Sequence, residues 1–443
     1  MKADASPAIY RKSRNLSDSD LLSDLQRVSL DYFINETNPE NGLVRDRNRD
    51  SSPASIAAVG LALTAWPVGV ARGMITRADA IARTLTTLRF LWNAPQGPER
   101  NASGHRGFFY HFLDMETGRR AWRSELSTID TALLMAGVLS AAAYFREDDK
   151  AEAEIRDLAD KLYSRVDWRW ALNGGGAVSH GWTSERGFLR YRWHGYDEAL
   201  ILYILGLGSP THALPPESYA AWLSTYKWKT IYGHELVYAG PLFIHQLSHI
   251  WIDFRGIADP WMRDRQTDYF ENSRRATYVQ REYAMRNPHG FVGYGQNCWG
   301  ITACDGPGPL IRVIDGVRRR FYGYRARGVP WGADDGTLSP WATAASLPFA
   351  PEIVIPALRH FHAIELEDDN PYGFTSGFNP TIEAADGRPC GWMCAEHVGV
   401  NQGPMALMIE NHRSDFVWTL MRTCPYVEAG LRRAGFAGGW LDR

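Results

Sequence analysis

The sequence predicts an all-α fold, an α/α barrel in which an outer ring of helices encloses an inner ring. Residues 54–71 contain no charged side chain, and residues 126–145 contain only Asp130. Each segment is therefore apolar on every face, as is typical of a helix enclosed by other helices. Small or polar residues interrupt both segments, so neither is apolar enough to favour a membrane span.

Helical periodicity recurs along most of the chain. Ser17 and Asp18 begin a capping pattern ahead of residues 21–33, whose apolar side chains recur at helical spacing. The same reasoning predicts helices over residues 56–66, 77–92, 128–145, 151–163, 198–207, 216–222, 242–251, 261–285, 351–361, 404–409, 416–422 and 427–434. Strand signals are few and short, and Gly, Pro, Asn and Trp gather in loops at 173–193, 290–299, 305–341 and 370–391. A helical solenoid is the alternative, but its units should be similar in length and these are not.

The composition is that of a globular protein and excludes several classes of function. Of the 443 residues, 45% are hydrophobic and 22% are charged, so a sizeable core is expected. The net charge of −2 leaves no positive surplus to hold a nucleic acid. The 17 tryptophans exceed the needs of a core and indicate a ligand with flat faces.

The cysteines and the N-terminal residues indicate which disulfides, metal sites and cellular compartments are to be expected. Five cysteines cannot all pair and include no Cys-x-x-Cys, which excludes a disulfide scaffold. Cys390, Cys394 and His397 resemble metal ligands loosely but lack a clear fourth, so no metal and no cofactor is predicted. We expect a tail at 1–16 followed by one domain at 17–443. Because the first residues lack the apolar stretch of a secretory signal, the chain is expected to be cytoplasmic, or periplasmic if a signal peptide has been removed.

Acidic residues lie at the starts of two apolar helices. Glu125 precedes and Asp130 lies inside the helix predicted at 128–145, while Asp197 and Glu198 open another apolar helix. A buried charge without a partner is costly, so each needs a purpose or a partner. Asp130 and Thr131 could instead tie an inner helix to its neighbour. Carboxylates at one end of a barrel would suit glycoside hydrolysis, which uses one acid and one base or nucleophile.

Several blocks in order resemble the glycoamylase-like proteins, in particular glycoside hydrolase family 144, whose members cut β-1,2-glucan, and the related region of cyclic β-1,2-glucan synthases. The blocks include residues 42–47 (GLVRDR), 127–134 (STIDTALL), 195–203 (GYDEALILY), 246–255 (QLSHIWIDFR), 294–307 (YGQNCWGITACDGP) and 403–411 (GPMALMIEN). The resemblance implies a single (α/α)6 barrel with a substrate cleft and an inverting reaction. It also implies that Glu125, Asp130 and Glu198 surround the scissile bond, without saying which is the acid. Asp197 stands where the family pattern has Asn.

Aromatic and polar residues of the long loops are the predicted sugar-binding residues. Sugar C–H faces stack on aromatic rings while neighbouring polar groups bind the hydroxyls. The aromatic candidates are Trp182, Trp193, Trp299, Trp331, Tyr372 and Phe374, and the polar ones are His194, Asp197, Asp253, Arg255, Gln296, Asp334 and Asn379. For any single one, plain packing is the competing interpretation.

The sequence therefore predicts a glycoside hydrolase that cleaves β-1,2-glucan internally to short gluco-oligosaccharides, with no metal and with a glycan as its partner. An exo-acting sophorose-releasing enzyme, a transglycosylase and a hydrolase of another bacterial glycan remain as alternatives. A non-catalytic glycan-binding protein is disfavoured, because a lectin would not need three carboxylates beside apolar helices.

Overall fold

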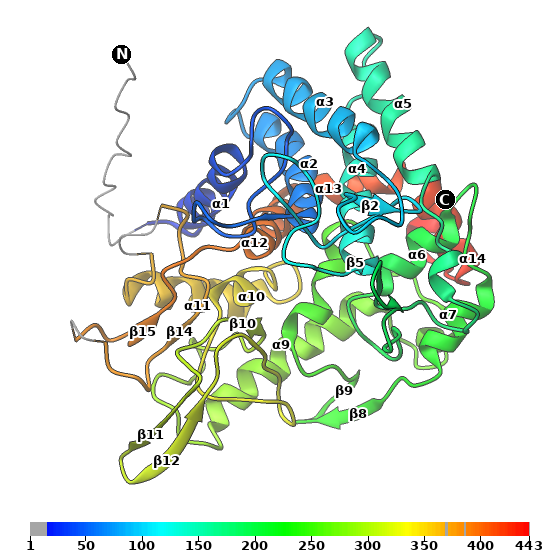
Figure 1. Cartoon of the computed structure of the whole chain (residues 1–443). Helices are drawn as coiled ribbons and strands as arrows, with labels where there is room; N and C mark the ends of the chain where they lie inside the picture. The colour runs from blue at the N-terminus through cyan, green and yellow to red at the C-terminus, as the bar shows by residue number, and fades with distance from the viewer. Residues whose placement is uncertain (1–15, 368–370, 385–386, 443) are drawn as a thin grey trace, which may run out of the picture.

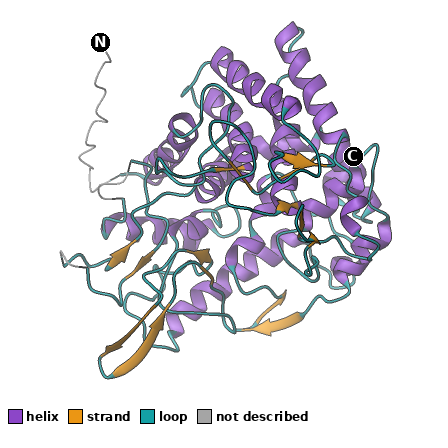
Figure 2. Ribbon diagram, in the orientation of Figure 1, coloured by secondary structure: helices purple, strands orange, loops and turns teal. Residues whose placement is uncertain are grey.

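The computed structural model describes residues 16–367, 371–384 and 387–442 (Figure 1). The predicted tail at 1–16 lies outside this range apart from Leu16, and so do residues 370, 385 and 386 of the predicted loop at 370–391. Helices are the main regular secondary structure of the described residues, and the strands are short and lie among the loops (Figure 2).

Inner and outer helices alternate along the chain as an (α/α)6 barrel. The outer helices are α1 (Asp18–Asn35), α3 (Arg77–Asn93), α5 (Lys150–Ser164), α7 (Pro216–Leu223), α9 (Tyr269–Arg286) and α11 (Pro351–Ala363). The inner ones are α2 (Ile56–Ala71), α4 (Thr128–Tyr144), α6 (Leu200–Gly208), the 3₁₀ pair η2 (Leu242–His245) and η3 (Leu247–Ile250), α10 (Pro340–Ala344) and α12 (Gly399–Ser414). Three more helices, α8 (Pro260–Arg263), α13 (Phe416–Arg422) and α14 (Pro425–Arg433), and two short 3₁₀ turns, η1 (Trp170–Leu172) and η4 (Gly439–Asp442), complete the helical part.

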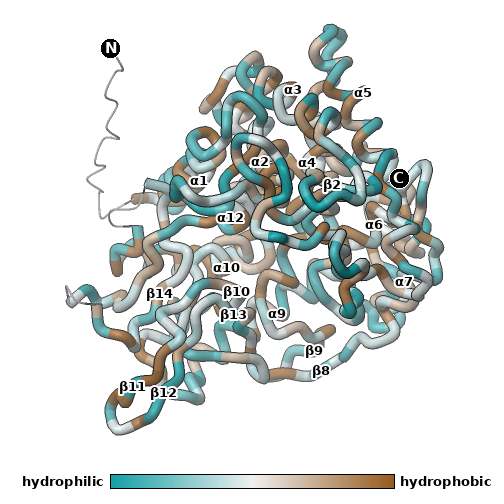
Figure 3. Tube along the Cα trace, in the orientation of Figure 1, coloured by the Kyte–Doolittle hydropathy of each residue, from teal (hydrophilic) through white to brown (hydrophobic). Residues whose placement is uncertain are grey.

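The two uncharged segments are enclosed, as the sequence predicts. Every residue of 56–66 is buried, and so is every residue of 128–139 except Asp130. The backbones of α2 and α4 pack directly at Gly60 and Gly137, where a Cβ on either would collide with the other helix. Outer helices are two-sided instead, and α5 alternates hydrophilic and hydrophobic residues along its length (Figure 3).

Two predicted helices are wrong in detail, and one helix was missed. The segment 242–251 forms two 3₁₀ turns separated at Gln246, whose buried amide donates to Ala342 O at 2.5 Å and Ser346 Oγ at 2.7 Å. The segment 261–285 is divided into α8 and α9, because Asp268 caps α9 by accepting from the Glu271 N–H. Helix α10 begins at the end of the predicted loop at 305–341 and was not predicted, since five residues are too few for a periodic signal.

Short antiparallel strands carry the loops that precede the inner helices. The pairs are β1 (Ala54–Ser55) with β4 (Phe112–Leu113), β2 (Gly104–His105) with β3 (Phe108–Phe109), β5 (Leu126–Ser127) with β6 (Gly181–Thr183), β6 with β7 (Gly187–Phe188), β8 (Trp228–Ile231) with β9 (His234–Val237), β10 (Ala303–Cys304) with β13 (Arg325–Ala326), β11 (Leu310–Ile314) with β12 (Val317–Phe321), and β14 (Phe378–Asn379) with β15 (Trp392–Met393). Strands β1 and β5 run directly into α2 and α4. The loops therefore gather at the N-terminal ends of the inner helices.

One hydrophobic core extends from Leu21 to Leu441, and a small second cluster lies between the β8–β9 hairpin and α9. Within the described part of the chain, no helix has the length and apolar character that a membrane crossing requires.

A buried ion pair fixes the long loop between β10 and α10. Arg327 Nε lies 2.7 Å from Asp335 Oδ1 and Nη2 lies 2.9 Å from Oδ2, and both side chains are 0% exposed. We expect Arg327→Met to lower the free energy of unfolding by about 3–5 kcal/mol, because it leaves the Asp335 carboxylate buried and unpaired. Urea unfolding measures this change.

The matched control for Arg327 is Arg89→Met, which removes the exposed ion pair between Arg89 and Glu154. An exposed pair contributes about 0–1 kcal/mol, so this variant should unfold almost as the wild type does. Equal losses in the two variants would contradict the structural role given to the buried pair.

Candidate active site

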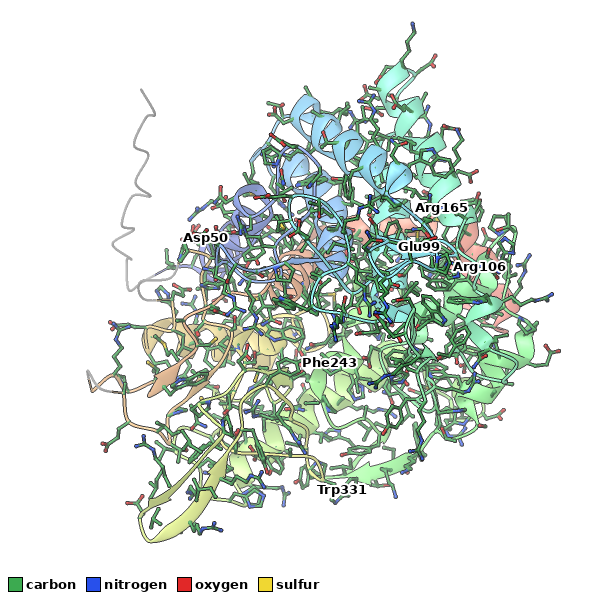
Figure 4. All side chains as sticks on the ribbon, in the orientation of Figure 1. Asp50, Glu99, Arg106, Arg165, Phe243 and Trp331 are labelled. Atoms are coloured by element: carbon green, nitrogen blue, oxygen red, sulfur yellow. The ribbon has the colours of Figure 1, made fainter. Side chains whose placement is uncertain are left out.

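Acidic side chains converge at the N-terminal ends of the inner helices α4 and α6. Phe243, at the start of η2, marks the same end of the barrel and lies near the centre of the view (Figure 4). We call the group of Glu125, Asp130, Asp197 and Glu198, together with His111, the carboxylate site.

His111 bridges two of these carboxylates. It lies between β3 and β4, and its Nδ1 is 2.9 Å from Glu125 Oε1 while its Nε2 is 3.6 Å from Asp130 Oδ2. Burial lowers the pKa of His111, but the charges of Asp130 and Glu125 outweigh this effect and raise the pKa to about 9. His111 is therefore an imidazolium at neutral pH.

Glu125 is kept ionised by this histidine. Burial raises the pKa of the Glu125 carboxyl, but the hydrogen bond and the charge of His111 lower it. Together with smaller effects they outweigh burial, so the pKa of Glu125 is below its usual value. The side chain is 33% exposed, so its carboxylate can meet a water molecule or a ligand.

At Asp197 and Glu198, by contrast, the surroundings raise the pKa of the carboxyl groups. Asp197 accepts hydrogen bonds from Trp222 Nε1 at 2.9 Å and from the Ala199 N–H at 3.1 Å, which fix it at the start of α6. Burial raises the pKa of Glu198, and the charges of Asp197 and then Asp130 raise it further. Burial raises the pKa of Asp197 as well. The site thus holds a carboxyl that retains its proton and a carboxylate that does not.

Asp130 and Thr131 differ in their contacts. Thr131 Oγ1 accepts from the Phe109 N–H at 3.1 Å, so this residue does tie α4 to β3. Asp130 Oδ2 accepts from the Ser127 hydroxyl at 2.5 Å, and the Ser127 hydroxyl caps the Asp130 N–H at 3.2 Å. Asp130 combines this capping role with its position beside His111.

Sequence reasoning missed several charged residues beside the site. Arg47 Nη1 lies 2.7 Å from Asp305 Oδ2 and 3.0 Å from Glu396 Oε2, and the neighbouring carboxyl of Asp46 contributes to the raised pKa of His111. His111 itself is the single basic residue in the run FFYHFL, and Asp46 and Arg47 lie in the GLVRDR block. A lone polar residue in an apolar run, and charged residues in a block that resembles the family, were the features of the sequence that could have indicated these residues.

Tyr324 is a further residue that the sequence did not single out. It directly precedes β13, opposite Asp305 in the register of the β10–β13 ladder, and the residue is 68% exposed. Although the residue is exposed overall, desolvation of its hydroxyl by the surrounding groups raises the pKa of Tyr324 to about 12, and the side chains of Cys304, Asp305 and Glu198 add to this rise. The Tyr324 hydroxyl thus lies within electrostatic range of Glu198.

Two of the predicted aromatic residues adjoin the carboxylate site. Trp182 pairs with Leu126 across β5 and β6, next to Glu125. Trp193 donates from Nε1 to Thr128 Oγ1 at 3.0 Å, at the first residue of α4, and its ring is stacked on His180 at 3.8 Å between centroids.

Eight of the ten remaining predicted binding residues fall into three groups. His194, Gln296 and Trp331 are exposed, and Trp331 lies below Phe243 in Figure 4. Trp299, Tyr372, Phe374 and Asn379 are buried among other side chains. Asp334 accepts from the hydroxyls of Tyr283 at 2.9 Å and Tyr294 at 2.7 Å.

Asp253 and Arg255 do not join the carboxylate site. They follow the C-terminal end of η3, at the other end of the barrel, where Arg255 binds Asp253 at 2.8 Å and Asp415 at 2.7 Å. Arg422 also pairs with Asp253. These contacts hold α12 and α13 to the loop after η3, so the two residues stabilise the fold in this structure.

The buried thiols of Cys390 and Cys394 and the side chain of His397 are engaged in packing and hydrogen bonds. Burial raises the pKa of the Cys394 thiol, and His397 Nδ1 lies 3.1 Å from Gln402 Nε2.

Comparison with known proteins assigns this barrel to a family. Residues 190–425 match the Glycoamylase family model, described as "Putative glucoamylase". The chain belongs to the Glycoamylase family.

Three relatives have informative descriptions. The "Exo beta-1,2-glucooligosaccharide sophorohydrolase (non-reducing end)" of Parabacteroides distasonis is 27% identical over 456 residues, covering 94% of this chain and 58% of the relative. The chain thus spans little more than half the length of that curated relative. The crystal structure of "a putative glucoamylase from Bacteroides uniformis" superposes with a TM-score of 0.84 at 30% identity, covering 97% of this chain and 100% of the other. The "Endo-beta-1,2-glucanase from Chitinophaga pinensis", in complex with sophorotriose and glucose, gives a TM-score of 0.82 at 27% identity, covering 96% and 100%.

Proposed function

We propose that the protein is a glycoside hydrolase that cleaves β-1,2-glucan internally, with inversion, to short gluco-oligosaccharides. The observation that carries the proposal is the gathering of Glu125 and Glu198 at the N-terminal ends of α4 and α6, where the contact with His111 lowers the pKa of Glu125 and burial raises the pKa of Glu198. Carboxyl groups whose environments push their pKa values apart are suited to act as acid and base. The descriptions of the relatives from Chitinophaga pinensis and Parabacteroides distasonis support the substrate.

In this mechanism Glu198 is the general acid and Glu125 the general base. Glu198 gives its proton to the glycosidic oxygen as the bond to the anomeric carbon breaks. Glu125 takes a proton from a water molecule whose oxygen bonds to that carbon on the opposite face, so the configuration inverts. Proton exchange with solvent then restores both groups. His111 and Asp130 position Glu125 and keep it ionised.

The exo-acting, sophorose-releasing reaction is the second candidate, because the Parabacteroides distasonis relative carries that description. We further propose that residues 17–443 form one catalytic domain, which the continuous core from Leu21 to Leu441 supports. A purely glycan-binding protein would leave the displaced pKa values of Glu125 and Glu198 without a use.

Incubation with linear β-1,2-glucan, with and without a chelator, and chromatographic sizing of the products test the proposal. Linear β-1,3-, β-1,4- and α-1,4-glucans serve as the comparison panel. We expect a ladder of short oligosaccharides from β-1,2-glucan alone, unchanged by the chelator. Sophorose as the sole early product would favour the exo reaction, and activity restricted to α-glucans would contradict both.

His111→Gln should shift the pH dependence of the reaction. In the wild type, kcat/KM falls as the pH drops through the lowered pKa of Glu125, which must be ionised to act as a base. Without the imidazolium, Glu125 loses the strongest influences that lower its pKa, so this pKa should rise and the acidic limb of the profile should move to higher pH. The exposed His212 provides the control variant His212→Gln. An unmoved acidic limb in His111→Gln would exclude Glu125 as the base.

A further inference from the structure

A strained and exposed tryptophan lies on the loop that leads to Glu125. Trp122 is 59% exposed and has a φ of +52°, and the next residue, Arg123, has a φ of +54°. Bulky side chains rarely adopt this left-handed region, and such strain persists only where the surrounding structure imposes it. The strained conformation therefore needs an anchor.

Arg120 is that anchor. Its guanidinium donates to Ser124 O at 2.6 Å and to Arg123 O at 2.9 Å, and it pairs with Glu185 of the β6–β7 hairpin at 2.9 Å. The Arg120 side chain is only 3% exposed and lies over the ring of Tyr110 at 4.5 Å. Trp122 therefore lies on a turn in which Arg120 holds the carbonyl oxygens of Arg123 and Ser124 by hydrogen bonds.

A row of rings connects this tryptophan to the carboxylate site. The Trp122 and Phe112 centroids are 5.2 Å apart, and Phe112 stacks on His111 at 3.9 Å with an interplanar angle of 12°. His111 in turn binds Glu125 at 2.9 Å. The ring of Trp122 is therefore within about 9 Å of His111, a separation that a short oligosaccharide can span.

We propose that Trp122 is a distal sugar-binding subsite, whose ring stacks on a glucosyl unit of the chain that is being cleaved. The inference rests on the proposed function, since it places the cleaved bond at the carboxylate site. A rigid aromatic ring held towards solvent offers contact area with little loss of conformational entropy on binding. The ring acts only on substrates long enough to reach it, so it determines chain-length preference rather than the chemical step.

Trp92 provides a matched contrast. It is also exposed, at 37%, but the Arg165 guanidinium lies over one face of its ring, 4.9 Å from the centroid. Arg165 is labelled in Figure 4, on the upper right of the view.

The test is the kcat/KM of Trp122→Ala, Trp122→Phe and Trp92→Ala on β-1,2-gluco-oligosaccharides of increasing length. We expect Trp122→Ala to lower kcat/KM about 3- to 10-fold on long chains and to leave the shortest cleavable chain unaffected, because an aromatic contact is lost only where a sugar reaches it. Trp122→Phe should retain part of the effect, and Trp92→Ala should match the wild type at every length. Thermal unfolding of each variant verifies that the fold is kept.

Equal losses at all chain lengths, or no loss at any length, would overturn the subsite. Failure of the proposed function has a different signature, namely that the wild type leaves β-1,2-glucan intact. In that case, affinities of the wild type and Trp122→Ala for length series of the panel glucans, measured by calorimetry, decide the subsite by the same criterion of length dependence.

Discussion

Glu198→Gln is expected to lower kcat on β-1,2-glucan by about 10²- to 10⁴-fold, the usual contribution of a general acid. An amide of the same shape cannot give a proton to the glycosidic oxygen. The fold should be kept, because burial and the charge of Asp197 already favour the neutral form of Glu198. Steady-state kinetics on the glucan measure the loss, and thermal unfolding measures the stability.

The direction of the change in stability in Glu198→Gln follows from the raised pKa of Glu198. Because the pKa of Glu198 is raised in the fold, its contribution to stability is fully present below the ordinary carboxyl pKa and is lost as the pH rises through the raised value. The amide variant lacks this loss, so at pH 8 it should unfold at the same or a higher temperature than the wild type. The exposed Glu217 supplies the control Glu217→Gln, which should change neither quantity. Near-normal turnover with reduced stability in Glu198→Gln would mean that this carboxyl is structural.

Glu125→Gln should produce a loss of similar size, about 10²- to 10⁴-fold in kcat, because the attacking water would lose its base. The imidazolium of His111 would remain, favoured by the charges of Asp130 and Asp46. Asp130→Asn should also lower turnover, since it removes a charge that raises the pKa of His111. Its effect reaches Glu125 through the histidine.

Small anions separate these two roles. Azide can replace the activated water where a base has been removed, so it should restore turnover in Glu125→Ala and yield a glycosyl azide of inverted configuration. Asp130→Ala should show no such rescue, because the base is still present. Rescue of Asp130→Ala alone would assign the base to Asp130 and contradict the role given to Glu125.

The inner helices α2 and α4 could be predicted from sequence because a fully enclosed helix has almost no charged residues over its whole length. The inner segment 242–251 has a different pattern, since His245, Gln246, Ser248 and His249 are buried polar residues that bind neighbouring elements. Their hydrogen bonds divide the segment into two 3₁₀ turns. Helix propensity and hydrophobic periodicity carry no information about such hydrogen-bond partners, so they could not predict this division.

The carboxylates of the site were identifiable, but their electrostatic roles were not. Glu125 and Asp130 are held by His111, which comes from another loop, and nothing in the sequence shows that its ring lies between them. The distance of Asp253 and Arg255 from the carboxylate site has a simpler origin. Both follow the inner segment 242–251, whereas Glu125 and Glu198 precede theirs, and the direction of the inner helices decides which end of the barrel a residue reaches.

The configuration of the first product formed from β-1,2-glucan tests the central claim most directly. Proton NMR recorded during the first minutes of the reaction distinguishes the two anomers before they equilibrate. A general acid at Glu198 with a water-activating base at Glu125 predicts that the α-anomer of the new reducing end appears first. Initial release of the β-anomer would mean a covalent glycosyl intermediate, and the assignment of Glu125 as a base rather than a nucleophile would be wrong.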